Sequence, residues 1–428
     1  MVNGRAVVRD QHPGPRIRPE IPISAPVIMR LPSFIRVAGG LLALGLLLAA
    51  TTPWEGPAAP QSAAVERSTS MALRAAVQGY IDALLDEGEF PGVSVGLMLA
   101  GGDTLLAVAG VADHASGDSL TGDSRFLAGS VGKTFFSAVI LQLVNEGLVE
   151  LDHPVARYLG DEPWYDRLPN SEEMTVRMLL NHTSGLVRYE FHPEVAERVS
   201  EDPDLVWTPE ERLAYLFDTE APFEAGEGWD YSDTNYIVLG MIIELLADSK
   251  AYDQIDRRFI GPLGLENTVP SDQRRIPGLV QGYAGSDNPF GRRNLMVEDG
   301  AMIFNPQLEW AGGGYASTPG DLAIWARALF SGAHIERELV RELVDGVPTP
   351  NSEITYGLGA MVYDTDLGPA YGHGGFFPGY LSEMRFYHAF DTSVAVQFNT
   401  SVVASVGRSP GEVAHELARL ASEFTFEP

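Results

Sequence analysis

The feature that most constrains the fold is the placement of strand-like segments at both ends of a long helical stretch. Residues 93–100 and 105–111 are rich in Val, Leu and Ala and flank Gly101-Gly102-Asp103, a pattern typical of a β-hairpin. Residues 383–389 and 392–399 alternate like strands and are joined by Phe390-Asp391. Sequential elements usually pack as neighbours, so we expect one sheet built from both ends of the chain, with the helical middle as an insertion.

Helical periodicity predicts the remaining elements. We expect helices over residues 71–85, 135–144, 176–181, 209–217, 236–247, 321–330 and 410–424. The predicted fold class is α/β (α+β): an antiparallel sheet flanked by helices, plus a mostly helical insertion. We assign residues 71–125 together with 311–428 to the sheet domain and residues 126–310 to the helical domain. Residues 270–308 are rich in Gly, Asp, Asn and Arg and fit no element, but could form a rim loop over a site.

Composition excludes several functions. The formal net charge is −29 and the pI about 4.6, so the surface repels nucleic-acid phosphates and anionic lipid heads. The chain has no cysteine, which excludes thiol catalysis, disulfides and thiolate metal sites. We therefore expect no nucleic-acid partner.

The N-terminal region predicts export. Residues 37–50 are a short apolar run behind Arg30 and Arg36, with small residues following, as in a signal peptide. The run is short for a spanning helix, which needs about 20 residues, although an uncleaved anchor at 37–50 is the alternative. We assign residues 1–52 to an N-terminal extension and signal peptide, with translation starting at Met1 or Met29, and residues 53–70 to a linker. The predicted location is periplasmic or extracellular.

Lysine is almost absent from the chain, so a position that keeps lysine instead of arginine is a candidate for chemistry. The chain has two lysines, and Lys133 follows Ser130 by three positions. Residues i and i+3 share a helix face, so the Lys133 amine can reach the Ser130 hydroxyl if a helix begins there. Burial would lower the pKa of Lys133 and let it act as a base, which arginine cannot do. The alternative is an N-cap serine followed by a surface lysine. Lys250 ends a helix in a polar turn and is expected to be solvated.

Two later segments add candidates. Tyr231-Ser232-Asp233 opens a helix after a glycine-rich turn, and its tyrosine can point into a cleft or merely fill the core. The segment around His373-Gly374-Gly375-Phe376 lies just before the C-terminal strands. Its glycines allow a backbone to approach a substrate closely, or they form a plain turn.

These motifs, in this order, resemble those of the serine β-lactamase and penicillin-binding-protein-like hydrolases. Within that family the chain is similar to the branch of class C β-lactamases, D-alanyl-D-alanine carboxypeptidases, D-aminopeptidases and family VIII esterases. Supporting segments are Leu180-Asn181-His182-Thr183-Ser184-Gly185-Leu186, in which we interpret His182 as structural, and the glycine-rich run 311–318. The resemblance covers roughly residues 70–425.

The resemblance implies roles for the catalytic candidates. Ser130 would be the nucleophile, Lys133 would activate it and Tyr231 would shuttle protons. His373 would replace the lysine of a Lys-Thr-Gly motif near the substrate carboxylate or the Tyr231 phenol. The backbone N–H groups of Ser130 and Phe376 would form the oxyanion hole, with Asp233 and Gly375 also lining the substrate site. No metal or organic cofactor is required.

Two departures from the family pattern affect the expected substrate. Asp233 stands where asparagine is usual, and an ionised aspartate cannot donate to a substrate carbonyl, although it can accept from Lys133. His373 in place of lysine removes a fixed charge and makes anion binding pH-dependent. The resemblance therefore implies a secreted acyl-enzyme hydrolase, a D-alanyl-D-alanine carboxypeptidase-like peptidase or related esterase, with a small-molecule or peptide substrate such as a D-Ala-type peptide, an ester or a β-lactam. A class C-like β-lactamase is the weaker enzyme alternative, and a non-catalytic binding module is the alternative of another class.

Overall fold

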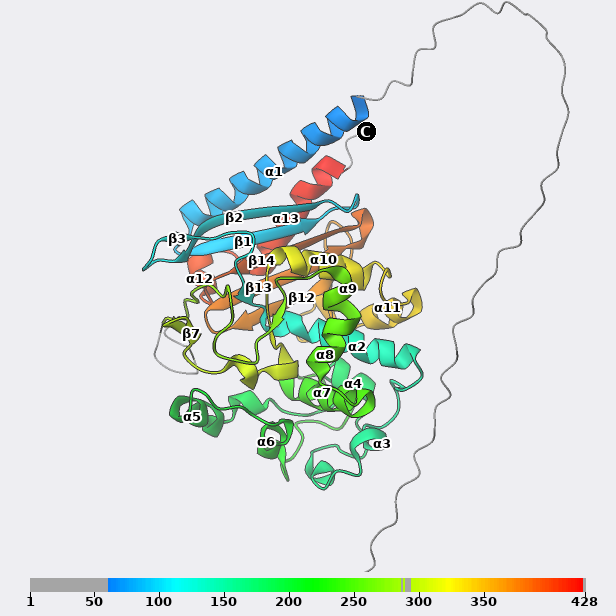
Figure 1. The fold of residues 1–428 in the computed structure, drawn as a ribbon. Helices are drawn as coiled ribbons and strands as arrows, with labels where there is room; N and C mark the ends of the chain where they lie inside the picture. The colour runs from blue at the N-terminus through cyan, green and yellow to red at the C-terminus, as the bar shows by residue number, and fades with distance from the viewer. Residues whose placement is uncertain (1–60, 286–287, 289–293, 426–428) are drawn as a thin grey trace, which may run out of the picture. The chain divides into compact units, whose positions relative to one another are not determined.

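The computed structural model describes residues 61–285, 288 and 294–425, and its centre is a nine-stranded antiparallel sheet (Figure 1). The strand order is β3-β2-β1-β14-β13-β12-β11-β10-β9. The bounds are β1 Gly92–Met98, β2 Thr104–Asp113, β3 Asp118–Ser119, β9 Val347–Pro348, β10 Ile354–Tyr356, β11 Met361–Tyr363, β12 Ala370–Phe377, β13 Tyr380–Tyr387 and β14 Thr392–Phe398. Because β1 pairs with β14, the predicted sheet built from both ends of the chain is confirmed.

Helices cover both faces of this sheet. The helices are α1 Gln61–Glu87, α2 Lys133–Asn145, α3 Ala156–Leu159, α4 Val176–Leu180, α5 Pro193–Glu201, α6 Pro209–Leu213, α7 Asp233–Ala247, α8 Ala251–Ile255, α9 Gly261–Leu263, α10 Pro319–Phe330, α11 Arg337–Val344, α12 Val403–Val406 and α13 Pro410–Thr425. Helices α1 and α13 pack on one face, and α10 packs on the other, with α2 beyond it (Figure 1). The predicted α/β class with flanking helices is confirmed.

Two buried clusters follow from this layering. The larger lies between the sheet and α2, α7 and α10, where the Phe135 ring stacks on Trp325 at 4.3 Å between centroids. The smaller lies under α1 and α13 and includes Val77 and Val413. Strand β14 is buried along its whole length, because each of its alternating faces meets one of these clusters.

The region between the sheet strands is mostly helical and also holds two small sheets. Strands β4 (Phe126–Leu127), β8 (Tyr315–Ser317) and β5 (Val269–Pro270) form one, and β6 (Val297–Glu298) and β7 (Ala301–Met302) form the other. All the described residues belong to one compact unit, and the division of this unit at residues 125 and 310 stays a prediction.

The predicted N-terminal boundary needs correction. Helix α1 begins at Gln61 rather than at residue 71, so part of the linker expected over 53–70 is helix. The polar segment 61–70 contains Ala, Glu, Gln and Arg, which are good helix formers. The predicted signal peptide and anchor lie outside the described residues. Among the helices that the structure describes, none has the length and apolar character needed to cross a membrane.

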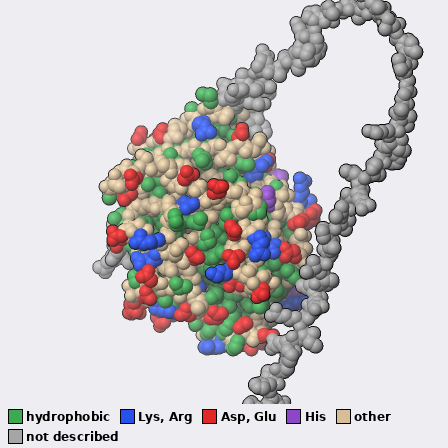
Figure 2. Space-filling model, viewed as in Figure 1, with side chains coloured by type: hydrophobic (Ala, Val, Ile, Leu, Met, Phe, Trp, Pro, Cys, Tyr) green, Lys and Arg blue, Asp and Glu red, His purple; other side chains and the backbone are tan. Residues whose placement is uncertain are grey.

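The surface carries the charge that composition predicts. On the face in Figure 2, acidic side chains are scattered and interleaved with Lys and Arg rather than separated into regions of one sign.

Candidate active site

Ser130 and Lys133 are brought together at the start of α2. Ser130 lies in a 3-10 turn, Gly129–Gly132, and α2 begins at Lys133, so the serine precedes the helix rather than opening it. The Lys133 Nζ donates to Ser130 Oγ at 3.1 Å. Gly132 packs against the carbonyl of Gly313, where a Cβ atom would lie only 1.6 Å from the oxygen. The turn that brings Ser130 and Lys133 together therefore requires glycine at position 132, because any side chain there would collide with Gly313.

Lys133 is completely buried and is paired with a carboxylate. Its Nζ also donates to an Asp233 carboxylate oxygen and to the carbonyl of Gly312. Burial is the largest single influence and would lower the pKa of Lys133, but Asp233 and Tyr231 together outweigh burial, and the pKa is raised above its usual value. The expectation that burial makes Lys133 a neutral base is therefore wrong for the free protein, because the residue at 233 is an aspartate.

Tyr231 and Asp233 stand at the N-terminal end of α7. Asp233 is the first helical residue, and its pKa is lowered because Lys133 and then Arg188 outweigh the effect of burial. The Tyr231 ring lies under the lysine, 4.9 Å from Nζ to the ring centroid. Its hydroxyl is buried, and hydrogen bonding to Lys133 and Ser130 acts to lower its pKa. Burial raises the pKa of Tyr231, so its phenol is neutral at pH 7.

His373 is buried and neutral, which corrects the expectation of partial protonation. The residue lies within strand β12 rather than in a turn. Its Nδ1 is 2.6 Å from the Gly374 carbonyl, which can only accept, so Nδ1 carries the hydrogen. Tyr356 then donates its hydroxyl to Nε2 at 2.8 Å. Burial, followed by the charge of Lys133, lowers the pKa of His373 to about 3.

Strand β12 approaches the Ser130 turn backbone to backbone. A Cβ atom at Gly375 would lie 2.0 Å from the Ala128 carbonyl oxygen, and one at Gly129 would lie 2.8 Å from the Phe376 nitrogen. Gly129 has a φ of 54°, which favours glycine. Both predicted residues of this segment, Gly375 and Phe376, therefore lie beside the turn that carries Ser130.

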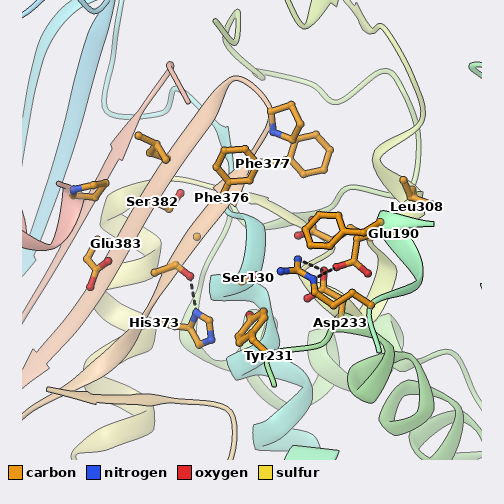
Figure 3. A pocket seen from close by; sticks show the side chains of 18 of the residues that line it. Ser130, Glu190, Tyr231, Asp233, Leu308, His373, Phe376, Phe377, Ser382 and Glu383 are labelled. Carbon is orange, nitrogen blue, oxygen red and sulfur yellow. Dashed lines mark hydrogen bonds and ion pairs between the residues drawn. The ribbon is translucent and has the colours of Figure 1, made fainter. Parts of the chain in front are cut away.

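These groups open into a cavity of about 600 Å³ (Figure 3). Figure 3 shows Tyr231, Asp233, Glu190 and His373 grouped around Ser130. Much of the remaining lining is aromatic or aliphatic: Tyr189, Phe191, Trp229, Phe304, Leu308, Met361, Phe376, Phe377, Pro378, Leu381 and Pro410. Phe304 and Leu308 come from residues 270–308, so this segment contributes to the cavity, as the sequence analysis allowed.

The ionisable groups that sequence reasoning missed are mainly acidic. Burial and then Asp233 raise the pKa of Glu190 to about 7, although Arg188 donates to it at 2.5 Å. The same two influences raise the pKa of Glu309 to about 8. Glu383 also lines the cavity and is paired with Arg385 at 2.7 Å. Glu190 has no motif of its own, and Glu309 is signalled only by its position just before the glycine-rich run 311–318.

Comparisons with known proteins agree on the family. The Beta-lactamase family model matches residues 77–418. Penicillin-binding protein 4* of Bacillus subtilis is 26% identical over 73% of this chain and 68% of its own. Esterase EstB of Burkholderia gladioli is 31% identical over 57% of this chain and 65% of its own.

Among solved structures, the D-amino acid amidase from Ochrobactrum anthropi SV3, complexed with D-phenylalanine, superposes with a TM-score of 0.70. It is 27% identical, and the match covers 82% of this chain and 98% of that chain. The motifs, the fold and these similarities lead to one conclusion: this chain belongs to the Beta-lactamase family and is a serine hydrolase.

Proposed function

We propose that this hydrolase forms an acyl-enzyme at Ser130 and acts on substrates that carry a free amino group, as amides or short peptides of D-amino acids. The carboxyl groups that line the cavity carry this proposal. Among its described lining residues, four are carboxyl-bearing and one is cationic, and that one, Arg188, is already paired with Glu190. A substrate ammonium group finds carboxyl groups that can accept from it, Glu190 among them, whereas a substrate carboxylate finds a neutral His373 and no unpaired cation among the described lining residues.

The reaction then follows from the positions of three side chains. Lys133 first releases one ammonium proton to solvent, and Ser130 Oγ then attacks the substrate carbonyl as its own proton passes to the lysine amine. The Tyr231 phenol, whose hydroxyl is buried beside the lysine, supplies a proton to the leaving group and takes one from the deacylating water, and Lys133 returns its proton to Ser130 when the acyl group leaves. The N–H groups of Ser130 and Phe376 would hold the oxyanion, and losing one such donor typically costs about 3 kcal/mol.

The D configuration is supported by the similarity to the D-amino acid amidase, which is named for its D-amino acid substrates. A carboxypeptidase that binds a free C-terminal carboxylate fits the cavity less well, because it needs an available cation. The β-lactamase alternative is weakened by Asp233, whose ionised carboxylate cannot donate to the substrate. Export, as the N-terminal sequence predicts, is part of the proposal and can be checked by sequencing the N-terminus of the mature protein.

An esterase is the second candidate function. The aromatic lining and the neutral His373 suit an uncharged ester, and EstB is a relative. The two candidates differ in whether the amino group of the substrate matters.

The test compares matched substrates. Intact-protein mass spectrometry after exposure to a fluorophosphonate, with Ser130→Ala as control, establishes whether Ser130 is the nucleophile. Hydrolysis of D-phenylalanine amide, its N-acetyl form, its L enantiomer and a p-nitrophenyl ester then defines the substrate. We expect the free D-amide to exceed the N-acetyl form in kcat/KM by about tenfold or more, the value of one hydrogen bond to a charged group. Equal rates on the two would contradict the amino-group proposal, and faster turnover of the ester would favour the esterase.

A further inference from the structure

His182 holds the residues on both sides of Tyr231. Its main-chain carbonyl accepts the N–H of Asp230 at 3.1 Å. Its Nδ1 accepts the N–H of Ser232 at 3.2 Å. The tyrosine therefore sits between two residues whose backbone is fixed by the same histidine.

The same ring nitrogen also reaches helix α7. Asn235 Nδ2 lies 3.0 Å from Nδ1, and Asn235 Oδ1 accepts from Ser184 Oγ at 2.5 Å. Because the N–H of Ser232 can only donate, Nδ1 is an acceptor and the hydrogen of the neutral ring is on Nε2. Burial, followed by the charge of Lys133, lowers the pKa of His182 well below its usual value, which keeps the ring in this neutral form.

The imidazole also supports the Tyr231 ring by contact. The two ring centroids are 4.3 Å apart, and the Tyr356 ring lies 4.6 Å from the imidazole on another side. The Tyr231 hydroxyl is buried next to Lys133 and Ser130. Its backbone and the packing of its ring determine whether the phenol reaches these two residues, and His182 contributes to both.

The backbone of His182 is itself in an uncommon conformation. Its φ is 64°, in the left-handed region, which asparagine tolerates far better than leucine. The side-chain oxygen Oδ1 of an asparagine is separated from Cα by the same number of bonds as Nδ1 of histidine. A His182→Asn variant thus keeps the acceptor and the backbone conformation, while His182→Leu loses both.

We infer that His182 is a positioning residue for Tyr231: it aims the phenol at Ser130 and Lys133 by holding residues 230 and 232 and by packing against the ring. The inference rests on the proposed function, because it assumes that Tyr231 transfers protons. His182 would then affect the rate of the reaction through Tyr231, whereas its sequence motif alone indicated a structural residue.

The experiment measures kcat and KM for the wild type, His182→Asn, His182→Leu, Tyr231→Phe and the double variant His182→Leu/Tyr231→Phe. We expect His182→Leu to lower kcat by about 100-fold, the lower end of what general acid–base catalysis contributes, with KM little changed. His182→Asn should keep kcat within about threefold of the wild type, because it can restore the bond to Ser232. In the double variant, loss of His182 should cost no further kcat, since its effect passes through the phenol.

A destabilised control separates positioning from folding. Val413→Ala removes buried volume in the cluster on the other face of the sheet, so it should lower the melting temperature and leave kcat unchanged. If His182→Leu does not fold, His182→Asn is compared with His182→Gln instead. The longer glutamine moves the acceptor away from Ser232, so His182→Gln should have the lower kcat of the two.

Two results would overturn the inference. One is that His182→Leu lowers kcat by the same factor in the wild type and in Tyr231→Phe. The other is a His182→Leu enzyme that keeps wild-type kcat while Tyr231→Phe is inactive. If Tyr231→Phe keeps full activity, the proposed role of Tyr231 fails first, and that outcome is separate from either of these.

Discussion

Replacing Asp233 with asparagine tests how the protonation of Lys133 is controlled. In the structure the lysine ammonium donates to Asp233, and its pKa is raised because Asp233, with Tyr231, outweighs burial. An asparagine fills the same space without the charge. Once the charge is gone, burial is the main remaining influence, and the amine form of Lys133 is favoured at lower pH.

The magnitude follows from the separation of the charges. Two unit charges about 4 Å apart attract by roughly 4 kcal/mol at an effective dielectric constant of about 20. Because about 1.4 kcal/mol is a factor of ten, removing the attraction raises the ratio of amine to ammonium by up to about a thousandfold. The carboxylate and the lysine are in direct contact in the structure.

The assay is the pH dependence of Ser130 labelling by a fluorophosphonate, a probe with no group that titrates in this range. In the wild type, labelling should be slow at pH 7 and rise at alkaline pH, where Lys133 loses its proton. In Asp233→Asn the rise should move to lower pH, and labelling at pH 7 should be faster. Asp230→Asn, the same change at an exposed position nearby, is the matched control. Profiles that superimpose, or slower labelling of Asp233→Asn at pH 7, would refute the reasoning.

Further predictions concern the rest of the site. Glu190→Gln should reduce kcat/KM about 10- to 150-fold for a free amino-acid amide and little for its N-acetyl form, by the value of a charged hydrogen bond. Since the pKa of Glu190 is raised to about 7, the wild type should lose this preference below pH 7 in steady-state kinetics, while the glutamine variant shows no such change. Gly375→Ala should abolish Ser130 labelling, because a Cβ atom there would lie 2.0 Å from a backbone carbonyl oxygen; labelling at the wild-type rate would contradict this. His373, whose pKa is lowered to about 3, should show no imidazole titration between pH 5 and 8 by NMR. The Lys133–Asp233 pair should stabilise the fold between the unfolded-state pKa values of about 4 and 10. The aspartate contribution disappears as the pH falls through its lowered pKa, and the lysine contribution as the pH rises through its raised pKa. Thermal unfolding of Asp233→Asn should lack this plateau.

Local patterns predicted much of the fold. The Val-, Leu- and Ala-rich runs in residues 93–111 and the alternation in residues 383–399 identified β1, β2, β13 and β14. The spacing of Ser130 and Lys133 predicted their contact, since it depends only on neighbours along the chain.

The charge states of the site depend on contacts that sequence spacing does not reveal. Asp233 was expected to accept from Lys133, but its effect on the lysine pKa depends on the burial of both groups. The neutral state of His373 depends on its complete burial and on Tyr356, a residue from another strand. Glu190 comes from an irregular segment whose path no local pattern indicates.

The pairing of β1 with β14 also determines when this protein can fold. Val93 pairs with Phe398, which lies 305 positions later in the chain. During synthesis β1 can form its hairpin with β2 early, but its other edge has no partner until nearly the whole chain exists. An exposed apolar edge of this kind is a template for pairing with other chains. The active-site strands β12 and β13 are therefore fixed to the N-terminal hairpin only after synthesis is almost complete, and a chain that stops before residue 392 lacks the strand that joins the two parts of the sheet.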